Sequence, residues 1–285
     1  MPVIQSLPGN KKDLGGFSVS RILPQPARRN VGPFVFYDEL GPARFEAGAG
    51  IDVRPHPHIG LATITWLFEG GLTHKDSLGH DVDIEPGAVN WMTAGRGIVH
   101  SERTPAALRE AGHTMHAIQS WVALPVSHEE QAPDFLHLDA KALPRFVREA
   151  VAVTVIVGDI LGLVSPVKFP HPVVYAEVRL AAGGELRLPA AWGEQAVYPV
   201  SGSACVDGTA LVPGSMAVLE DGHNSVLQTN DAALVMVLGG QPYPEARHIE
   251  WNFVHHDKAR IATAVADWRD GRFDKVPGDD EFIPY

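Results

Sequence analysis

Two short runs of this chain contain side chains of the kinds that bind transition metals. The first is His56-Pro-His58, and the second, much further along, is His100-Ser-Glu102. Residues two apart on an extended strand point to the same face and lie roughly 6.8 Å apart along it, so each run offers two donor groups to one point. Three imidazoles and one carboxylate suit a divalent transition metal, and iron, manganese, nickel, copper and zinc all accept such ligands. The pattern therefore indicates a metalloprotein built on β-structure.

The residues beside both runs favour a fixed geometry. Pro55 and Pro57 restrict φ and keep the segment extended, which leaves the two neighbouring histidines little freedom. Gly95 and Gly97 let the backbone turn sharply just before His100. The stretch between the two runs is long enough for several strands and a return to the same end of a barrel. We predict that the two runs meet at one ion.

The donor set favours catalysis over a purely structural role. A structural zinc site more often uses several cysteines and is closed, whereas this sequence has one cysteine, Cys205. Three neutral imidazoles and one carboxylate leave a divalent ion with net positive charge, which attracts an anionic ligand. Glu102 then has two alternative roles, because it can ligate the ion throughout or leave the ion and take a proton from a bound hydroxyl. The sequence does not decide between these roles.

Residues on the neighbouring segments are candidates for the wall of a pocket above the metal. They are His116, Trp66, Phe68, Met92 and Ile98, with Trp91 and Trp121 as further candidates. The competing interpretation is that the apolar members are ordinary barrel core and that the histidine lies at the rim or behind the ligands. Several other histidines need be no more than surface or loop residues, among them His74, His80, His113, His255 and His256.

Composition limits the classes of function. The chain has 285 residues, of which 45% are hydrophobic, as expected for a soluble globular protein of one large domain or two ordinary ones. Its net charge of −11 argues against direct nucleic-acid binding. No stretch approaches the roughly 20 apolar residues of a membrane span, and no secretory signal is evident. The single cysteine fits a reducing compartment, so we expect a cytoplasmic monomer, or a nuclear one in a eukaryote.

The pattern of strands and turns indicates an all-β protein in two halves. In both halves, short runs of β-branched and aromatic residues alternate with glycine and proline turns. We predict an N-terminal metal-binding domain over residues 1–135 and a C-terminal domain over residues 136–285, with the stretch 125–144 connecting them. The second half has no His-x-His and no His-x-Glu, so the metal is expected in the first half alone. One short late helix is predicted, capped by Asp257 and ended by Gly271.

Longer segments around the metal-binding runs resemble a known family. The stretch RPHPHIGLATITWLFEGGLTHKDSLGH (54–80), followed by NWMTAGRGIVHSE (90–102), closely resembles the pirins, members of the cupin superfamily. VGPFVFYDELGP (31–42), HAIQSWVALP (116–125) and DGRF (270–273) are also similar to pirin sequences. The likeness is specific from about residue 31 to residue 125 and weaker near the C-terminus.

The resemblance implies a bicupin, in which an N-terminal cupin-type β-barrel carries the metal and a C-terminal one is degenerate. It implies that His56, His58, His100 and Glu102 are the ligands and that Fe(II) is the cofactor, since iron is the usual metal of the family. Some pirins open flavonols such as quercetin with dioxygen, and others are described as nuclear cofactors whose partner binding follows the redox state of the iron. This chain has Ile59 where arginine is frequent after the HPH run, a difference that leaves the ligands intact but could alter the mouth of the pocket.

Two functions of different classes follow as hypotheses. The first is an iron-dependent dioxygenase of the quercetin 2,3-dioxygenase type, which takes a small aromatic substrate and dioxygen and uses Glu102 as the proton acceptor. The second is a non-enzymatic, redox-dependent interaction module for a protein partner, because a degenerate barrel adds surface without chemistry. A different metal or substrate, as in an isomerase-type cupin, is a third alternative. We rank the enzyme first, although fold and family alone do not fix function.

Overall fold

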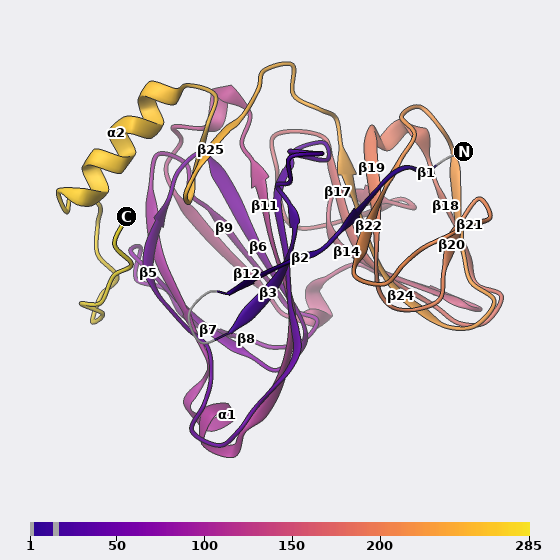
Figure 1. The fold of residues 1–285 in the computed structure, drawn as a ribbon, viewed down its shortest axis with the longest axis horizontal. Coiled ribbons are helices and arrows are strands. Elements are labelled where there is room, and N and C mark those ends of the chain that lie inside the picture. Colours follow the sequence, from indigo (N-terminus) through magenta and orange to yellow (C-terminus); the bar gives the residue numbers. More distant parts are fainter. Residues whose placement is uncertain (1–2, 14–16) are drawn as a thin grey trace. The chain divides into compact units, whose positions relative to one another are not determined.

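The structure is a computed structural model that describes residues 3–13 and 17–285. The chain forms two compact units, and each is assembled from separate stretches of sequence. The histidine unit comprises Asp13–Val19, Glu39–Ala140 and Pro244–Tyr285, and the companion unit comprises Met1–Lys12, Ser20–Asp38 and Lys141–Tyr243. Figure 1 shows the path of the chain through both units. The division of the sequence into domains 1–135 and 136–285 stays a prediction.

The histidine unit is built from antiparallel strands. Its elements are β5 (Asp52–His58), β6 (Leu61–Glu69), β7 (Leu72–Asp76), β8 (Asp81–Ile84), β9 (Val89–Thr93), β10 (Ile98–Arg103), α1 (Ala106–Ala111), β11 (His113–Ala123), β12 (Asp134–Leu138), β25 (His248–Glu250), β26 (Phe253–His255) and α2 (Lys258–Arg269). Three strands carry residues of both units, namely β2 (Asn10–Asp13), β3 (Ser18–Leu23) and β4 (Phe34–Phe45). One sheet has the strand order β5-β10-β7-β8, and a second contains the order β12-β9-β6-β11-β4.

Local sequence explains the strands that carry the site. Strand β6 is LATITWLFE, in which β-branched and aromatic residues favour a pleated, buried surface. The turn before β10 closes with a bond from the Gly97 amide to the Ala94 carbonyl, 2.9 Å. Gly95 in this turn has φ of +52°, and a Cβ there would lie 2.1 Å from the Gln131 carbonyl oxygen, so only glycine fits. This turn sets where β10 begins.

Apolar clusters hold the histidine unit together, and two of them lie near the site. One fills the barrel and consists of Phe45, Ile51, Leu67, Leu72, Ile84, Ala88, Met115 and Ala117. The other packs α2 against the end of β5 and consists of Ile59, Phe253, Ile261, Ala264 and Val265. The Asp257 side chain accepts a bond from the Ala259 amide and caps α2, and Gly271 follows the last turn. The predicted late helix is confirmed, and α2 lies beside the strands of this unit in Figure 1.

The companion unit is a second set of antiparallel strands. Its elements are β1 (Val3–Pro8), β13 (Arg145–Arg148), β14 (Val151–Val157), β15 (Asp159–Ile160), β16 (Leu163–Val164), β17 (Val173–Leu180), β18 (Glu185–Leu188), β19 (Glu194–Gly202), β20 (Cys205–Val206), β21 (Thr209–Ala210), β22 (Ser215–Leu219), β23 (Ser225–Gln228) and β24 (Ala233–Gly240). The main sheet has the order β1-β22-β19-β24-β17-β14-β13, and the smaller one has the order β18-β23-β20-β21. The N-terminal strand is therefore an edge strand of this unit.

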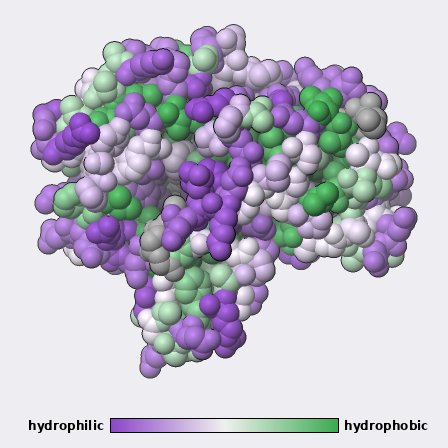
Figure 2. Space-filling view, in the orientation of Figure 1, coloured by the Kyte–Doolittle hydropathy of each residue, from purple (hydrophilic) through white to green (hydrophobic). Residues whose placement is uncertain are grey.

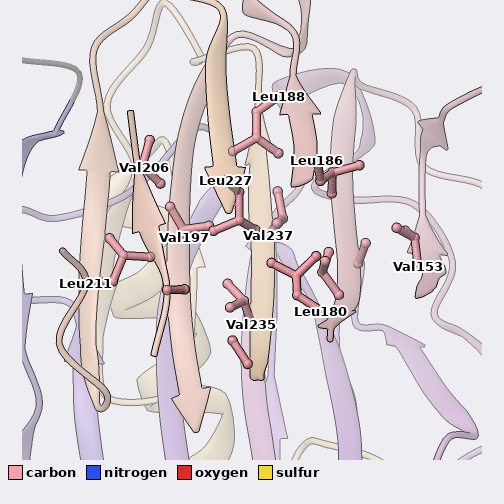
Figure 3. Packing of buried hydrophobic residues seen from close by; sticks show 14 of the residues in the cluster. Val153, Leu180, Leu186, Leu188, Val197, Val206, Leu211, Leu227, Val235 and Val237 are labelled. Carbon is pink, nitrogen blue, oxygen red and sulfur yellow. The ribbon is translucent and has the colours of Figure 1, made fainter. Parts of the chain in front are cut away.

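Aliphatic side chains fill the interior of the companion unit. Leu188, Val197 and Leu227 are fully buried there, and Figure 3 shows such side chains pointing toward one another between the strands. Over residues 3–13 and 17–285, the groups of three or more histidine or carboxylate side chains close enough to share an ion all lie in the histidine unit. The companion interior thus consists of packed hydrocarbon where the histidine unit holds imidazoles.

As predicted, short strands of β-branched and aromatic residues occur in both halves of the sequence, for example at 89–93, 151–157 and 173–180. Two features differ from the predictions. The stretch 125–144 is more than a connection, because it contains β12, which pairs antiparallel with β9. A second short helix, α1, was not predicted, since its six residues are too few to show a helical period. None of the helices in the described parts of the chain is both long and apolar enough to cross a membrane.

Candidate metal centre

Three histidines meet on one face of the β5–β10 pair. The two strands are antiparallel, with His100 opposite His56 and Ile98 opposite His58, so alternation places all four side chains on the same face. Each histidine offers a ring nitrogen, and these nitrogens all lie within 4.8 Å of one another. The rings are buried, with exposed fractions of 7% for His56 and 1% for each of the other two. The structure therefore brings together the three predicted imidazole ligands.

The hydrogen bonds of these rings assign their protons. His56 Nδ1 lies 2.9 Å from the Arg54 carbonyl oxygen, and His58 Nδ1 lies 3.0 Å from the Asn252 carbonyl oxygen. A carbonyl only accepts, so both Nδ1 atoms are donors and the Nε2 atom of each neutral ring carries a lone pair. The opposite tautomer would leave each carbonyl facing a lone pair. Both rings are thus prepared to ligate through Nε2.

The spacing of the nitrogens fits a shared ion. His58 Nε2 lies 3.2 Å from His100 Nε2. Two nitrogens about 2.1 Å from one ion would be separated by roughly 3.0–3.4 Å at ordinary coordination angles. Two buried ring nitrogens at this distance must share either a proton or a cation. The donor chemistry and the spacing both suit a transition metal.

Glu102 lies on the same strand as His100 but in a different environment. A β-bulge between these two residues shifts the pairing with β5. The Glu102 carboxylate is buried, and its Oε1 accepts a bond of 3.0 Å from the Thr65 hydroxyl of the facing sheet. It is not part of the close group of three imidazoles. Burial raises the pKa of Glu102 above its ordinary value, against the opposing influence of His74 and Thr65, which makes the carboxylate a better base. Its role as fourth ligand stays a prediction.

Burial also determines the protonation of the histidines. Removal from water lowers the pKa of His56 to about 4 and lowers those of His58 and His100 well below the ordinary value. All three rings are therefore neutral at physiological pH. Neutral imidazole is the form that binds a metal, so little free energy is needed to deprotonate the site before an ion enters.

These pKa shifts predict an acid-sensitive metal-free protein. His56 binds a proton below about pH 6.5 when unfolded but only below about pH 4 when folded, so its contribution favours unfolding increasingly as the pH falls through that window. The difference corresponds to about 3 kcal/mol for this residue. Urea unfolding of chelator-treated protein between pH 7 and pH 4 should show this loss, and His56→Gln should reduce it. The exposed residue His223 supplies a control, and a slope equally reduced by His223→Gln would contradict the assignment.

The structure separates the predicted pocket residues into two sets. Ile98 lies opposite His58 in the β5–β10 pair, and Met92 lies opposite Thr63, two residues from Thr65 on the site-facing side of β6. Ile98 therefore lies on the face that bears the histidines, and Met92 lies on the face that bears Thr65, the hydrogen-bond partner of Glu102. The other three predicted residues lie elsewhere. Trp66 and Phe68 alternate with Thr65, and His116 bonds to Glu39 at 2.9 Å and contacts the Phe68 ring, so none of them is brought together with the histidines.

The structure also places Trp121, a further candidate for the pocket wall, and a histidine with no predicted role near the centre. The Trp121 ring centroid lies 5.1 Å from that of His58, so this side chain forms part of the wall. His74, His113 and His255 are only 2%, 7% and 4% exposed, and the prediction that they are loop or surface residues was wrong. His74 Nδ1 lies 3.4 Å from His100 Nδ1, and His74 Nε2 lies 3.0 Å from an Asp76 oxygen. For His74 and Asp76, a period-two strand pattern over 72–76 is the sequence signal that could have placed them.

A second cluster in the histidine unit contains Glu129, His255 and His256. Its hydrogen bonds fit an ion-paired contact better than a metal site. The Asp257 amide donates to His255 Nδ1, which leaves the proton on Nε2, the atom that faces the carboxylates. His256 Nδ1 contacts a carboxylate oxygen of Glu129 and is its donor. Both nitrogens that would have to bind an ion therefore carry protons.

Comparison with known proteins decides the family. The pirin family model matches residues 16–122, and the model of the pirin C-terminal cupin domain matches residues 175–274. A pirin-like protein from Caulobacter vibrioides is 47% identical over 279 residues, which is 96% of both chains. The chain belongs to the pirin family. The predicted resemblance to pirins is confirmed.

Solved structures agree with this membership. A quercetin 2,3-dioxygenase from Acinetobacter baumannii superposes on this pirin with a TM-score of 0.89 at 34% identity, covering 98% of this chain and 95% of that one. A bacterial pirin from Escherichia coli, solved in complex with nickel(II), gives a TM-score of 0.66 at 17% identity over 84% of this chain and 99% of the other, which shows the shared fold. The predicted all-β class with two cupin-type domains is confirmed for this pirin.

Proposed function

We propose that this pirin is an iron(II)-dependent dioxygenase that opens a flavonol such as quercetin with dioxygen. The observation that carries the proposal is the set of three buried, neutral imidazoles whose nitrogens converge beside a buried carboxylate. The likeness to a quercetin 2,3-dioxygenase from Acinetobacter baumannii supports the reaction class. A cytoplasmic location, expected from the single cysteine, belongs to the same proposal.

The residues proposed to hold the metal are His56, His58, His100 and Glu102. Three imidazoles and a carboxylate suit Fe(II), and also Mn, Ni, Cu or Zn, so the proposal of iron rests on the usual metal of the family. When bound, the ion would supply the Lewis acidity and the electron-transfer chemistry that dioxygen requires. The protein supplies the neutral ligands, the buried setting and the proton acceptor.

Glu102 is the proposed acceptor of the proton from the flavonol hydroxyl. Burial raises its pKa, so it binds a proton more readily than an exposed carboxylate does. The Thr65 hydroxyl donates to Glu102 Oε1 at 3.0 Å, which orients the carboxylate. The apolar side chains of Trp121, Met92 and Ile98 would exclude water from the reacting ring.

An aerobic assay tests this function directly. Iron-loaded protein should remove the flavonol absorbance of quercetin and release carbon monoxide, and chelator-treated protein should not. Glu102→Gln separates the two roles of this residue, because retained iron with lost turnover indicates a base and lost iron indicates a ligand. Protein with a full complement of iron that leaves quercetin unchanged would refute the proposed activity.

The non-enzymatic alternative depends on a surface for a protein partner. On the face shown in Figure 2, hydrophobic side chains form separate patches among hydrophilic ones. A partner on that face would therefore meet a mainly mixed or polar surface. Affinity capture with iron-loaded and metal-free protein distinguishes the alternative, since a redox-dependent module would retain different partners in the two states. We rank the enzyme first because three buried imidazoles beside a buried carboxylate are side chains that can carry out a reaction.

A further inference from the structure

A chain of polar side chains continues from His100 away from the metal centre. Strand β7 pairs antiparallel with β10, with Asp76 opposite His100 and His74 opposite Glu102, so these side chains share the face of the site. Asp76 is fully buried and His74 is 2% exposed. A buried carboxylate and imidazole are costly unless they are fully bonded, and the proposed function gives neither a role.

The hydrogen bonds fix the direction of this chain. The backbone amides of Leu78 and His80 both donate to Asp76 Oδ1, so the carboxyl group acts here as an acceptor. A carboxylate only accepts, so His74 donates through Nε2, 3.0 Å from Asp76 Oδ2. In neutral His74 the other nitrogen, Nδ1, is then an acceptor. It lies 3.4 Å from His100 Nδ1, which must be the donor, so the lone pair of His100 is on Nε2.

Surrounding contacts hold the chain in this arrangement. The amides of Leu78 and His80 donate to Asp76 Oδ1 at 2.9 and 3.1 Å, and His80 Nδ1 donates to Oδ2 at 2.9 Å. The Phe135 ring stacks on the His74 ring with centroids 4.2 Å apart and planes 10° apart. The carboxylate and the imidazole therefore have little freedom to rotate. Such preorganisation is how groups behind metal ligands tune them.

We propose that Asp76 and His74 are positioning residues that fix the tautomer of His100, keep its Nε2 lone pair directed at the metal, and make that nitrogen a stronger donor. The inference rests on the metal centre of the proposed function and adds two residues to it. His56 and His58 have backbone carbonyls in the corresponding place, so His100 is the ligand whose donor strength depends on a charged side chain.

Asp76→Asn tests the proposal with almost no change of shape. The side-chain oxygen can still accept from the Leu78 and His80 amides, while the new NH₂ group faces His74 Nε2. That nitrogen must then accept, so His74 donates through Nδ1 and His100 is forced to carry its proton on Nε2. We expect nickel(II) affinity, measured by calorimetric titration, to fall about 10- to 100-fold. In the metal-free variant, ¹⁵N spectra of the imidazoles should show a protonated His100 Nε2.

Two further variants keep the test decisive. Asp81→Asn removes the same charge from an exposed residue of β8 that pairs with Lys75, and it should leave nickel affinity unchanged. If Asp76→Asn does not fold, His74→Phe keeps a ring against Phe135 but removes the acceptor, and the same loss is expected. Unchanged affinity and an unchanged His100 tautomer in a folded variant would overturn the inference and leave the metal centre standing. Failure of the wild-type protein to bind nickel would overturn both.

Discussion

His58→Ala should abolish metal binding and turnover while the protein remains folded. The His58 ring is central to the site, since its Nε2 lies 3.2 Å from His100 Nε2 and its centroid lies 5.0 Å from that of His56. Removing it leaves two imidazoles and one carboxylate, and the lost donor cannot be replaced by a neighbour of the same geometry. The loss of affinity should exceed the roughly 10- to 100-fold effect typical of residues behind the ligands.

The fold should survive because the ion is not part of the core. The apolar cluster of the barrel, which includes Leu67, Leu72 and Met115, does not depend on His58. The variant leaves the Asn252 carbonyl without its ring donor, which costs about 1 kcal/mol. Elemental analysis for metal content and far-ultraviolet circular dichroism measure the two outcomes separately. His223→Ala is the matched control on an exposed histidine, and wild-type metal content in His58→Ala would disprove the ligand assignment.

The sequence was sufficient to predict that each pair of donor side chains shares a face, because their spacing and their geometry have the same cause. On a strand, a separation of two residues places side chains on one face, and the prolines at 55 and 57 identify β5 as extended. The convergence of β5 with β10 could not be derived from spacing alone. It depends on register, which puts His100 opposite His56. The family resemblance supplied that step.

The pocket wall illustrates what the sequence could not predict. Trp66 and Trp121 are similar aromatic residues on neighbouring strands, and composition does not distinguish them. The pairing of Ile118 with Trp66 and of Gln119 with Thr65 shows that Trp66 and Trp121 lie on opposite faces of the sheet. A shift of one residue in this register would exchange their positions. Which aromatic residue meets the histidines is therefore a tertiary property.

Asp76 and Glu129 were missed for a related reason. Each lies in a stretch that looks polar and loop-like in sequence, and each is fully buried in the structure. Strand pairing places Asp76 opposite His100, and the fold brings Glu129 to Arg247 of the C-terminal segment. The burial of Glu129 cannot be recognised from its neighbours, since the arginine that permits it is brought close only by the fold.

Glu129→Ala should give a large loss of stability although it lies outside the metal centre. Glu129 is fully buried, and its Oε1 lies 3.2 Å from Nε of Arg247, whose side chain is 4% exposed. The same carboxylate accepts from the His256 amide at 3.0 Å and from the His256 ring. Removing one partner of a buried ion pair leaves the other charge without compensation, which costs about 3–5 kcal/mol.

The adjacent carboxylate provides a matched control. Glu130 pairs with Arg260, but its side chain is 53% exposed, so Glu130→Ala should cost less than about 1 kcal/mol. Urea unfolding of the two variants measures the difference in the free energy of unfolding. Equal losses in Glu129→Ala and Glu130→Ala would show that the buried pair contributes no more than a surface pair.

A double-mutant cycle shows whether the loss in Glu129→Ala arises from the pair itself. Arg247 also donates to the Leu124 carbonyl at 3.2 Å, so Arg247→Ala removes more than the contact with Glu129. If the unpaired charge is the main cost, the double variant should be less destabilised than the sum of the two single variants, with a coupling of about 1–3 kcal/mol.

Because the pair ties the 125–131 stretch to the segment that carries Asn252, its loss should also loosen the carbonyl that orients His58. The metal affinity of Glu129→Ala should then fall, because the His58 ring is held less firmly by the Asn252 carbonyl, whereas Glu130→Ala should keep wild-type affinity.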